Sequence, residues 1–572
     1  MKKTTTLSPV QRLYKLFEIN KQEIASIYIY AAFNGVLALS LPLGIQAIIN
    51  LLTGGQISTS WIVLVILVII GIALTGFMQI MQLKISEDLQ QKIFTRSSFE
   101  FAYRIPRMKL ENLRKEYTPE LVNRFFDTLT VQKGLPKILI EFSSSSLQII
   151  FGLILLSLYH PFFILYSFLL LIIIFLIFKF TGPKGLSTSL VESKHKYEVA
   201  HWLEEVGKSM ATFKLAGNSP LPMDKTDIAT TNYLTSRKAH FKTLLIQYIN
   251  LVTFKVLMAA GLLLIGGLLV INQQMNIGQF VASEIIIILI LNSVEKLILS
   301  METIYDVLTA VEKIGIITDL ELDRDVGEEI DPTENGISIE LRNVSFRYSD
   351  SNTNALNNLN FNIKEGEKIC LSGYNGSGKS LLLQIIAGLY DDFTGTISFN
   401  NLPSTHIKKE YLHMLIGDSL SKEDIFKGNI IENISLGKPN IEMQDIKKIC
   451  GVLGVSDFIE NLPQGYKTEL LPEGLNIPTS IKRRIVLARA VIAKPKLLLL
   501  EESFNQLNEK DKENFLSYIL TMPTTLIAVS NDSLVAEKLD KTIVMNKGEI
   551  LAIDHAAMFK NKKWYLDIFT GK

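Results

Sequence analysis

A glycine-rich segment carries residue types that are suited to binding phosphate. It consists of Gly373, Tyr374, Asn375, Gly376, Ser377, Gly378, Lys379 and Ser380, in the pattern G-x-x-x-x-G-K-S. Its glycines let successive backbone N–H groups wrap phosphate oxygens, and the N-terminus of the helix that follows adds partial positive charge. Lys379 is then placed to reach the β- and γ-phosphates, and Ser380 to ligate Mg²⁺. The segment predicts a site for a nucleoside triphosphate and its magnesium ion.

Two adjacent carboxylates, Glu501 and Glu502, come directly after the wholly apolar run 497–500. Such a run is typical of a central strand in a parallel sheet, which is buried on both faces. The carboxyl end of that strand can deliver carboxylates to a magnesium-bound nucleotide. The alternative is a buried strand that ends in a solvated acidic turn. The preceding phosphate loop favours the magnesium site.

The elements around these residues indicate a soluble α/β domain. Residues 368–372 have the pattern of a buried strand and 381–387 that of a helix, as a phosphate loop requires. An acidic linker over 318–332 precedes the alternating segment 337–346, which predicts a strand and a domain boundary near residue 330. Cys370 and Cys450 both lie on the soluble side. Two cysteines are too few for a disulfide framework, so we expect reduced core residues.

The first half of the chain is far more apolar. Hydrophobic residues make up 48% of the 572 residues and charged residues only 20%, with a formal net charge of +1. Runs of about 20 apolar residues, enough to cross a bilayer, occur near 24–52, 61–83, 138–160, 161–182, 243–271 and 278–305. The first run is too long for a signal peptide and has no convincing cleavage site, so we expect six retained spans. The balanced charge argues against nucleic acid as a partner.

The placement of lysine and arginine sets the expected orientation. The segments 53–60, 160–161 and 272–277, which follow the odd-numbered spans, contain neither residue, whereas the other connecting segments contain many. Positively charged loops stay in the cytoplasm, so we expect both termini to be cytoplasmic. The long segments 84–137 and 183–242 have helical periodicity. This predicts that the spans continue as helices far into the cytoplasm, each pair ending in a tip.

Ionisable residues inside the predicted spans are candidates for function, because charge within a bilayer is costly. Counted from segment 272–277 at about 1.5 Å per residue, Lys255 and Glu295 lie at matching depths of roughly 24 to 26 Å. An ion pair lining a cavity is one interpretation, and snorkelling at the inner interface is the other. Glu284, about 9 Å below the same segment, is a candidate for lining an outward-facing pathway.

The combination of six spans, helical extensions and a phosphate-loop domain resembles a half-transporter of the ATP-binding cassette (ABC) exporter family. This resemblance implies a membrane α-helical domain of six spans followed by an α/β P-loop NTPase domain. We expect a transmembrane domain over 1–315, a linker over 316–336 and the ATP-binding cassette over 337–572. The segments 39–46, 277–284 and 293–297 are most similar to the type I secretion group, which exports toxins and proteases.

Three further residues match positions of the family's nucleotide site. Tyr348 corresponds to the aromatic residue that stacks on adenine, with a surface tyrosine at a strand end as the alternative. Glu501 stands at the Walker B position, where the family has an aspartate, and is one methylene longer. Glu502 stands at the position of the general base. The resemblance thus implies ATP and Mg²⁺ as ligands, with Ser380 and Glu501 on the metal.

Other positions depart from the family's pattern. Ser421 replaces the Q-loop glutamine, Asn508 the D-loop aspartate and Asn531 the switch histidine, and Pro478, Thr479 and Ser480 replace the signature serine and two glycines. Pro478 supplies neither a hydroxyl nor an N–H, and Thr479 and Ser480 add Cβ atoms where backbone amides approach a γ-phosphate. Asn531 can hydrogen-bond but cannot carry positive charge. We therefore expect ATP binding with weak hydrolysis.

The leading hypothesis is a dimeric translocase in the bacterial inner membrane, with the cassette in the cytoplasm, that couples ATP binding to outward transport. Its expected partners are the lipid bilayer and a second half-transporter, in a homodimer or a heterodimer, and a periplasmic adaptor is a further candidate. Two alternatives stay open. One is the degenerate partner of a heteromeric exporter, and the other is a non-transporting membrane protein that uses ATP for regulation. The sequence does not identify the cargo.

Overall fold

The computed structural model describes residues 7–53, 59–113, 118–349, 351–420, 424–505 and 507–569. The chain divides into two compact units, one made of residues 1–107 and 115–320 and the other of residues 108–114 and 321–572. The last long helix ends at Thr318 and the first strand begins at Ile339. The expected domain limits at 315 and 337 stay predictions.

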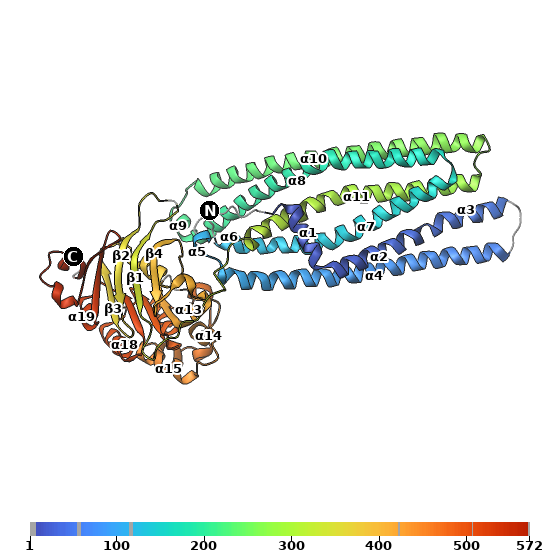
Figure 1. Cartoon of the computed structure of the whole chain (residues 1–572). Helices are drawn as coiled ribbons and strands as arrows, with labels where there is room; N and C mark the ends of the chain where they lie inside the picture. The colour runs from blue at the N-terminus through green and yellow to red at the C-terminus, as the bar shows by residue number, and fades with distance from the viewer. Residues whose placement is uncertain are drawn as a thin grey trace. The chain divides into compact units, whose positions relative to one another are not determined.

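The first unit consists of helices over its described residues (Figure 1). Its helices are α1 (Pro9–Ile19), α2 (Lys21–Ala38), α3 (Ser40–Thr53), α4 (Thr59–Arg104), η1 (Ile105–Arg107), α6 (Thr118–Asn123), η2 (Arg124–Phe126), α7 (Asp127–Tyr159), α8 (Phe162–Lys208), α9 (Met210–Leu215), α10 (Leu221–Ile271) and α11 (Ile277–Thr318), whereas α5 (Leu110–Leu113) belongs to the second unit. Six helical segments of the described chain are long and apolar enough to cross a membrane, which confirms the six predicted spans.

The first span is interrupted where α2 meets α3. The Leu39 N–H bonds to the carbonyl oxygens of Val36 and Leu37 instead of the carbonyl four residues back. Pro42 lies in the first turn of α3. A proline has no N–H to donate, and its ring clashes with the carbonyl four residues earlier. This explains why the helix is interrupted near Leu39.

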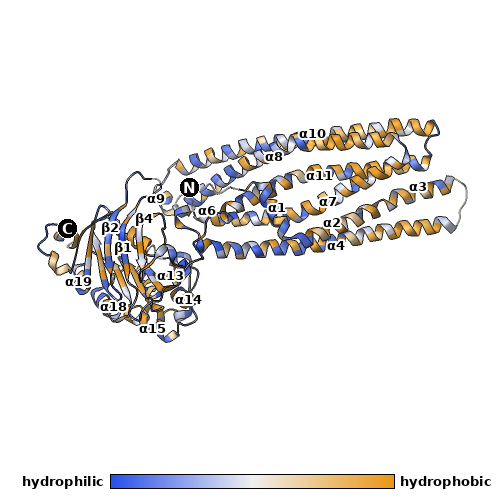
Figure 2. Ribbon diagram, in the orientation of Figure 1, coloured by the Kyte–Doolittle hydropathy of each residue, from blue (hydrophilic) through white to orange (hydrophobic). Residues whose placement is uncertain are grey.

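The long helices pack in pairs, α7 along α11 and α8 along α10, while α4 lies beside α2 and α7. α8 has 47 residues and α10 has 51, well above the roughly 20 that cross a bilayer. Figure 2 shows that apolar residues are concentrated toward the end at which α10 turns into α11, while polar residues predominate toward the other end. The spans therefore continue as long helices, as predicted.

Lys255 of α10 and Glu295 of α11 form an ion pair, which was one of the two interpretations of their matching depths, with Lys255 Nζ 2.6 Å from Glu295 Oε2. Their side chains are 32% and 31% exposed. The next residue, Lys296, lies on a different face of α11, because successive helical residues are rotated by about 100°. Glu284 is half-buried on the same helix. Its role in a pathway stays a prediction.

The second unit is the predicted α/β domain. Its strands are β1 (Ile339–Phe346), β2 (Leu356–Ile363), β3 (Lys368–Gly373), β4 (Phe393–Phe399), β5 (Leu402–Pro403), β6 (Ile416–Ser419), β7 (Gly428–Asn429), β8 (Glu469–Leu470), β9 (Leu497–Glu501), β10 (Thr525–Val529), β11 (Lys541–Asn546) and β12 (Glu549–Asp554). A six-stranded mixed sheet has the order β12-β11-β3-β10-β9-β6, and a four-stranded sheet has the order β2-β1-β4-β5.

Helices complete this unit. They are α12 (Lys379–Ile386), η3 (Ser404–His406), α13 (Lys409–Leu415), α14 (Ile430–Ser435), α15 (Met443–Val452), α16 (Ser456–Glu460), η4 (Gly465–Lys467), η5 (Pro472–Gly474), α17 (Thr479–Ile492), α18 (Glu509–Thr521), α19 (Ser533–Lys538), η6 (Ala556–Phe559) and α20 (Tyr565–Phe569).

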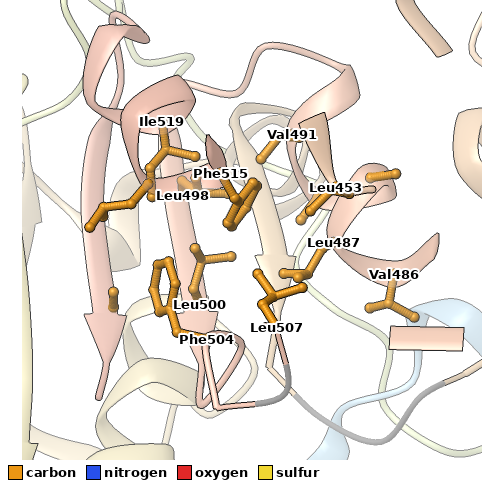
Figure 3. Packing of buried hydrophobic residues seen from close by; sticks show 14 of the residues in the cluster. Leu453, Val486, Leu487, Val491, Leu498, Leu500, Phe504, Leu507, Phe515 and Ile519 are labelled. Carbon is orange, nitrogen blue, oxygen red and sulfur yellow. The ribbon is translucent and has the colours of Figure 1, made fainter. Parts of the chain in front are cut away.

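The six-stranded sheet has a hydrophobic core on each face. Along β9, Leu498 and Leu500 belong to one buried cluster, and Leu497 and Leu499 belong to the other. This alternation follows from the two-residue repeat of a strand. Figure 3 shows Leu498 and Leu500 beside Phe515 of α18. Packing on both faces holds the central strands in position, and the predicted site residues lie at the ends of these strands.

Candidate nucleotide site

Three neighbouring parallel strands bring the predicted site residues to one edge of the sheet. β10 pairs with β3 on one side and with β9 on the other, and Val529 of β10 lies opposite both Leu371 and Glu501. The phosphate loop follows β3, Asn531 follows β10 and Glu502 follows β9. Parallel strands end at the same edge, where open α/β sheets bind ligands. The loop, the switch position and the acidic pair therefore lie together.

The phosphate loop has a backbone that requires glycine. Gly373, Gly376 and Gly378 have φ angles of +142°, +75° and +97°, which residues with a Cβ rarely adopt. A Cβ built at Gly373 would lie 2.1 Å from the carbonyl oxygen of Met545. At Gly376, by contrast, no described atom lies within 4 Å of a built Cβ. The loop is packed closely at its start and open in its middle, where a ligand would approach.

Lys379 lies over this loop. Its Nζ donates to the carbonyl oxygens of Gly373 and Tyr374, each at 2.9 Å. Burial lowers the pKa of Lys379, and the nearby carboxylates of Glu502 and Glu501 oppose that shift. Gly378 forms the N-cap of α12, so the N-terminus of this helix also faces the loop. A cation and a helix N-terminus at one loop are suited to an anion.

Ser377 adds a second indication that the loop binds a ligand. Its side chain is 2% exposed, and its hydroxyl oxygen has no hydrogen-bond partner among the described residues. Buried polar atoms are nearly always paired in folded proteins. The orphaned hydroxyl, the lysine and the glycine backbone together fit a triphosphate.

Ser380 and Glu501, the two predicted metal ligands, lie close enough for the Ser380 hydroxyl to affect the pKa of the Glu501 carboxyl. Burial raises the pKa of Glu501, the Ser380 hydroxyl lowers it, and the charge of Glu502 raises it. Hydroxyl and carboxylate oxygens are donors that Mg²⁺ prefers. The described residues contain no group of three or more His, Cys, Asp or Glu side chains that could hold a metal ion. These two residues fit Mg²⁺ that is shared with phosphate oxygens.

Glu502 is exposed and has a φ of +48°. Its N–H donates to the Val529 carbonyl oxygen at 3.1 Å, which fixes the backbone where β9 ends. A positive φ is uncommon for a residue with a side chain, and such conformations cluster at functional sites. An exposed carboxylate here can accept a proton from water, as the general base must.

Asn531, at the switch position, is fully engaged with the start of the phosphate loop. Its Oδ1 accepts from the Ser372 hydroxyl at 2.8 Å and from the Gly373 N–H at 3.2 Å. Its Nδ2 donates to the Gly373 carbonyl oxygen at 3.2 Å. The sequence did not predict these bonds, because Ser372 belongs to another strand. Asn531 therefore supports the loop and supplies no charge.

The signature segment begins a helix, as predicted. Pro478 is the N-cap of α17, with φ −60° and ψ 146°, and its carbonyl accepts from the N–H groups of Ile481 and Lys482. Pro478, Thr479 and Ser480 are all exposed. The helix N-terminus is present, but the first position has no N–H and the next two carry side chains. Their contribution to nucleotide binding stays a prediction.

Asn508, at the D-loop position, caps α18. It accepts from the Asp511 N–H at 2.8 Å and donates to Asp511 Oδ2 at 2.8 Å. Arg484 of α17 lies 2.8 Å from the same carboxylate, and the two charged side chains are 12% and 11% exposed. An ion pair thus ties the helix of the signature segment to the helix that follows the acidic pair. This pair could not be predicted from the sequence, since neither residue belongs to a local motif.

Tyr348 packs in a group of three aromatic residues. Its ring centroid lies 5.0 Å from that of Phe346 and 6.5 Å from that of Tyr390, with interplanar angles of 88° and 81°. Edge-to-face packing of this kind fixes the orientation of a ring. Stacking of adenine on Tyr348 stays a prediction.

Ser421, the predicted Q-loop position, lies outside the described residues, and its role stays a prediction. The structure instead describes the end of the preceding strand, β6. There the Ser503 hydroxyl donates to Ser419 Oγ at 3.2 Å, which joins the end of β6 to the segment after Glu502. Burial raises the pKa of Asp418 on the same strand.

Two family models match the chain. The one described as ABC transporter transmembrane region matches residues 24–294, and the one described as ABC transporter matches residues 356–505. The chain belongs to the ABC transporters. It is a half-transporter, an integral membrane protein in which six apolar helices precede an ATP-binding domain.

Curated relatives of this ABC half-transporter have low sequence identity to it. The chain is 32% identical over 262 residues to the uncharacterized ABC transporter ATP-binding protein YfiB of Bacillus subtilis (strain 168), covering 46% of each chain. It is 28% identical over 287 residues to the alpha-hemolysin translocation ATP-binding protein HlyB of Escherichia coli O157:H7, covering 50% of this chain and 40% of that one. It is 23% identical over 440 residues to the transport/processing ATP-binding protein ComA of Streptococcus pneumoniae serotype 4, covering 76% and 61%. The match spans less than two thirds of each relative.

A solved structure gives the fold of the half-transporter directly. A bacterial Atm1-family ABC exporter with ATP bound superposes with a TM-score of 0.84, covering 96% of this chain and 97% of that chain at 18% identity. The half-transporter therefore has the exporter fold over nearly its whole length.

Proposed function

We propose that the protein is a subunit of an ATP-driven exporter, in which ATP binding to two cassettes moves a substrate outward across the membrane. The observation that carries this proposal is the intact phosphate loop in a chain that has the exporter fold. Within this loop, Lys379 donates hydrogen bonds to the carbonyl oxygens of Gly373 and Tyr374. The expected place is the bacterial inner membrane, with the termini and the cassette in the cytoplasm. Segments 160–161 and 272–277, which contain no Lys or Arg, support this orientation.

The residues of the cassette have separate roles in this proposal. Lys379 and the loop amides bind the phosphates, and Tyr348 supports the base. Ser380 and Glu501 hold Mg²⁺, which would neutralise charge on the phosphates. Glu502 accepts the proton of the attacking water.

Hydrolysis is proposed to be slow. The Asn531 amide is bonded to Ser372 and Gly373 and has no charge to offer a γ-phosphate. Pro478 has no N–H to donate at the start of the signature helix. The side chains of Thr479 and Ser480 keep the γ-phosphate away from the backbone amides of this segment. Loss of one transition-state donor typically costs about 10² to 10³ in rate.

The proposed assembly is a dimer, because two cassettes complete each site of an exporter. A homodimer needs no further chain, and a heterodimer with an intact second half-transporter is the alternative. The names of HlyB and ComA, which refer to alpha-hemolysin translocation and to transport and processing, support an export role. A periplasmic adaptor stays a predicted partner. ATP-dependent regulation without transport is the competing function, supported by the altered switch and signature positions.

Accumulation of solutes in proteoliposomes separates transport from regulation. The purified protein would be reconstituted with cassettes outward, supplied with ATP and an extract of the source cells, and the lumen analysed by mass spectrometry. An exporter accumulates at least one solute, and Lys379→Ala or omission of ATP abolishes this. ATP binding with no solute accumulated would favour the regulatory function.

A further inference from the structure

A cavity of about 530 Å³ lies within the transmembrane unit, lined by residues of α2, α3, α4, α7 and α11. Its volume falls in the range of roughly 300 to 1,000 Å³ that is typical of small-molecule sites. We propose that this cavity binds a short zwitterionic peptide, whose carboxylate pairs with Lys296 and whose ammonium group pairs with Glu141. The proposal rests on the exporter function and names a class of substrate for it.

Two opposite charges line the cavity from neighbouring helices. Glu141 of α7 accepts a hydrogen bond from the hydroxyl of Ser300 on α11. That hydroxyl also donates to the carbonyl oxygen of Lys296, one turn earlier on α11, at 2.7 Å. The Glu141 carboxylate therefore lies beside the turn of α11 that begins at Lys296, whose exposed side chain also lines the cavity. A ligand that carries both charges can reach both residues.

These two charges differ from the ion pair on the other face of α11. Lys255 and Glu295 neutralise each other across 2.6 Å. Within the part of the chain that the structure describes, Glu141 and Lys296 have no ion-pair partner. Charged side chains within membrane spans are costly and mark substrate or ion pathways. The cavity charges are therefore the ones available to a ligand.

Amide side chains suit the cavity to peptide groups. Asn34 of α2 has a buried Oδ1 that lacks a hydrogen-bond partner among the described residues. Gln82 of α4 is 2% exposed, and its Nε2 is 3.4 Å from Ser144 Oγ. Gln148 of α7 accepts from another helix, through the Ser293 hydroxyl at 2.9 Å. Asparagine and glutamine each offer donors and an acceptor. These complement the N–H and C=O of a peptide group, whereas a zwitterionic lipid headgroup has no amide between its phosphate and its ammonium group.

Binding of defined peptides tests the proposal without ATP. The probe is a mixture of all tripeptides of Ala, Leu and Phe, presented to the full-length protein in nanodiscs of phosphatidylcholine and phosphatidylglycerol. Matched mixtures are acetylated at the N-terminus or amidated at the C-terminus, and retained peptides are measured by equilibrium dialysis and mass spectrometry. We expect the unblocked mixture to bind and each blocked mixture to bind about tenfold more weakly or worse, because each loses one charge-assisted hydrogen bond.

Two variants test which residue binds which charged end of the peptide. Glu141→Gln should bind the unblocked and the acetylated mixtures equally, and Lys296→Gln should bind the unblocked and the amidated mixtures equally. Lys242→Gln, at an exposed residue of α10 outside the residues that line the cavity, should keep the preferences of the unmodified protein. Absence of peptide binding to the unmodified protein, or equal binding of all three mixtures, would overturn the proposal. Displacement of the peptides by glycerophosphoethanolamine would assign the cavity to a lipid headgroup and overturn it as well.

The failure of this site can be told apart from failure of the exporter function. Peptide binding that depends on Glu141 and Lys296, with no ATP-driven accumulation in proteoliposomes, supports the site and rejects export. Accumulation that is unchanged in Glu141→Gln and Lys296→Gln supports export and rejects the site.

Discussion

The Ser372 hydroxyl donates a hydrogen bond of 2.8 Å to Asn531 Oδ1, which joins the carboxyl ends of β3 and β10. The N–H and carbonyl of Gly373 engage the rest of the amide. The side chain at the switch position is thereby part of the support of the phosphate loop. We expect a site built in this way to bind nucleotide and to assist its cleavage only weakly.

Nucleotide binding should depend on Lys379. In Lys379→Ala, affinity for Mg-ATP should fall by about tenfold or more, because charge-assisted hydrogen bonds to phosphate are lost. Lys510→Ala, which removes an exposed lysine of α18, is the matched control and should bind normally. Binding would be measured by isothermal titration calorimetry. Undiminished affinity in Lys379→Ala would mean that the loop is structural only.

Stability should depend on the protonation of Glu501. Burial raises the pKa of Glu501, so the folded protein holds this proton more tightly than the unfolded chain does. The resulting stabilisation is complete below the ordinary glutamate pKa of about 4.3 and is lost as pH rises through the folded-state pKa. Near neutral pH and without Mg²⁺, Glu501→Gln should therefore denature at a higher temperature than the unmodified protein.

The difference between Glu501→Gln and the unmodified protein should shrink as pH is lowered toward the ordinary glutamate pKa. Thermal denaturation in detergent across this pH range measures it, with Glu365→Gln, an exposed carboxyl of the same domain, as the control. A difference in denaturation temperature that increases as pH is lowered would contradict the raised pKa of Glu501.

The ion pair of Arg484 and Asp511 should stabilise the cassette. Arg484→Ala leaves a carboxylate that is only 11% exposed without its cation, and breaking one side of a buried pair costs about 3 kcal/mol. Combining Arg484→Ala with Asp511→Asn should recover part of the loss, because no charge is then left unpaired. Thermal denaturation would reveal this recovery, and strictly additive losses would show that the two residues are not coupled.

The proposed topology places the turn between α10 and α11 outside the cell. Gln273 there has a φ of +57°, so its exposed neighbour Gln274 is the better labelling position. Gln274→Cys should react with an impermeant thiol reagent in intact cells, whereas Lys510→Cys should react only after permeabilisation. The native Cys370 and Cys450 are 0% exposed, which keeps background labelling low. The reverse pattern would invert the topology. Gln56, in the first outer segment, lies outside the described residues.

Local chemistry explains what the sequence could predict. The spacing of Gly373, Lys379 and Ser380, with the strand pattern of 368–372 and the helix pattern of 381–387 beside it, predicts a phosphate loop, and apolar runs predict the spans. Counting back from one turn gave matching depths for Lys255 and Glu295, which made an ion pair one of two interpretations. Contacts between distant segments were not predictable. The bonds of Asn531 to Ser372, the Arg484–Asp511 pair and the cavity beside Lys296 all depend on which strands and helices become neighbours.

The rate of ATP hydrolysis by the protein alone should be low, and substitution of the altered positions by the family's residues should raise it. Asn531→His by itself should change the rate little, because the signature segment of the opposing cassette in a homodimer stays altered. Joint replacement of Pro478, Thr479 and Ser480 by Ser, Gly and Gly, together with Asn531→His, should raise the rate. The individual costs are not multiplied, since residues that act as one unit are non-additive.

Phosphate release by the reconstituted, unmodified protein in saturating Mg-ATP, with Glu502→Gln as the blank, tests the central claim of ATP binding with weak hydrolysis. We predict saturable ATP binding together with turnover well below the enzyme median of about 10 per second. Fast turnover that Glu502→Gln abolishes would contradict this claim, because Thr479, Ser480 and Asn531 would then substitute fully for the residues they replace.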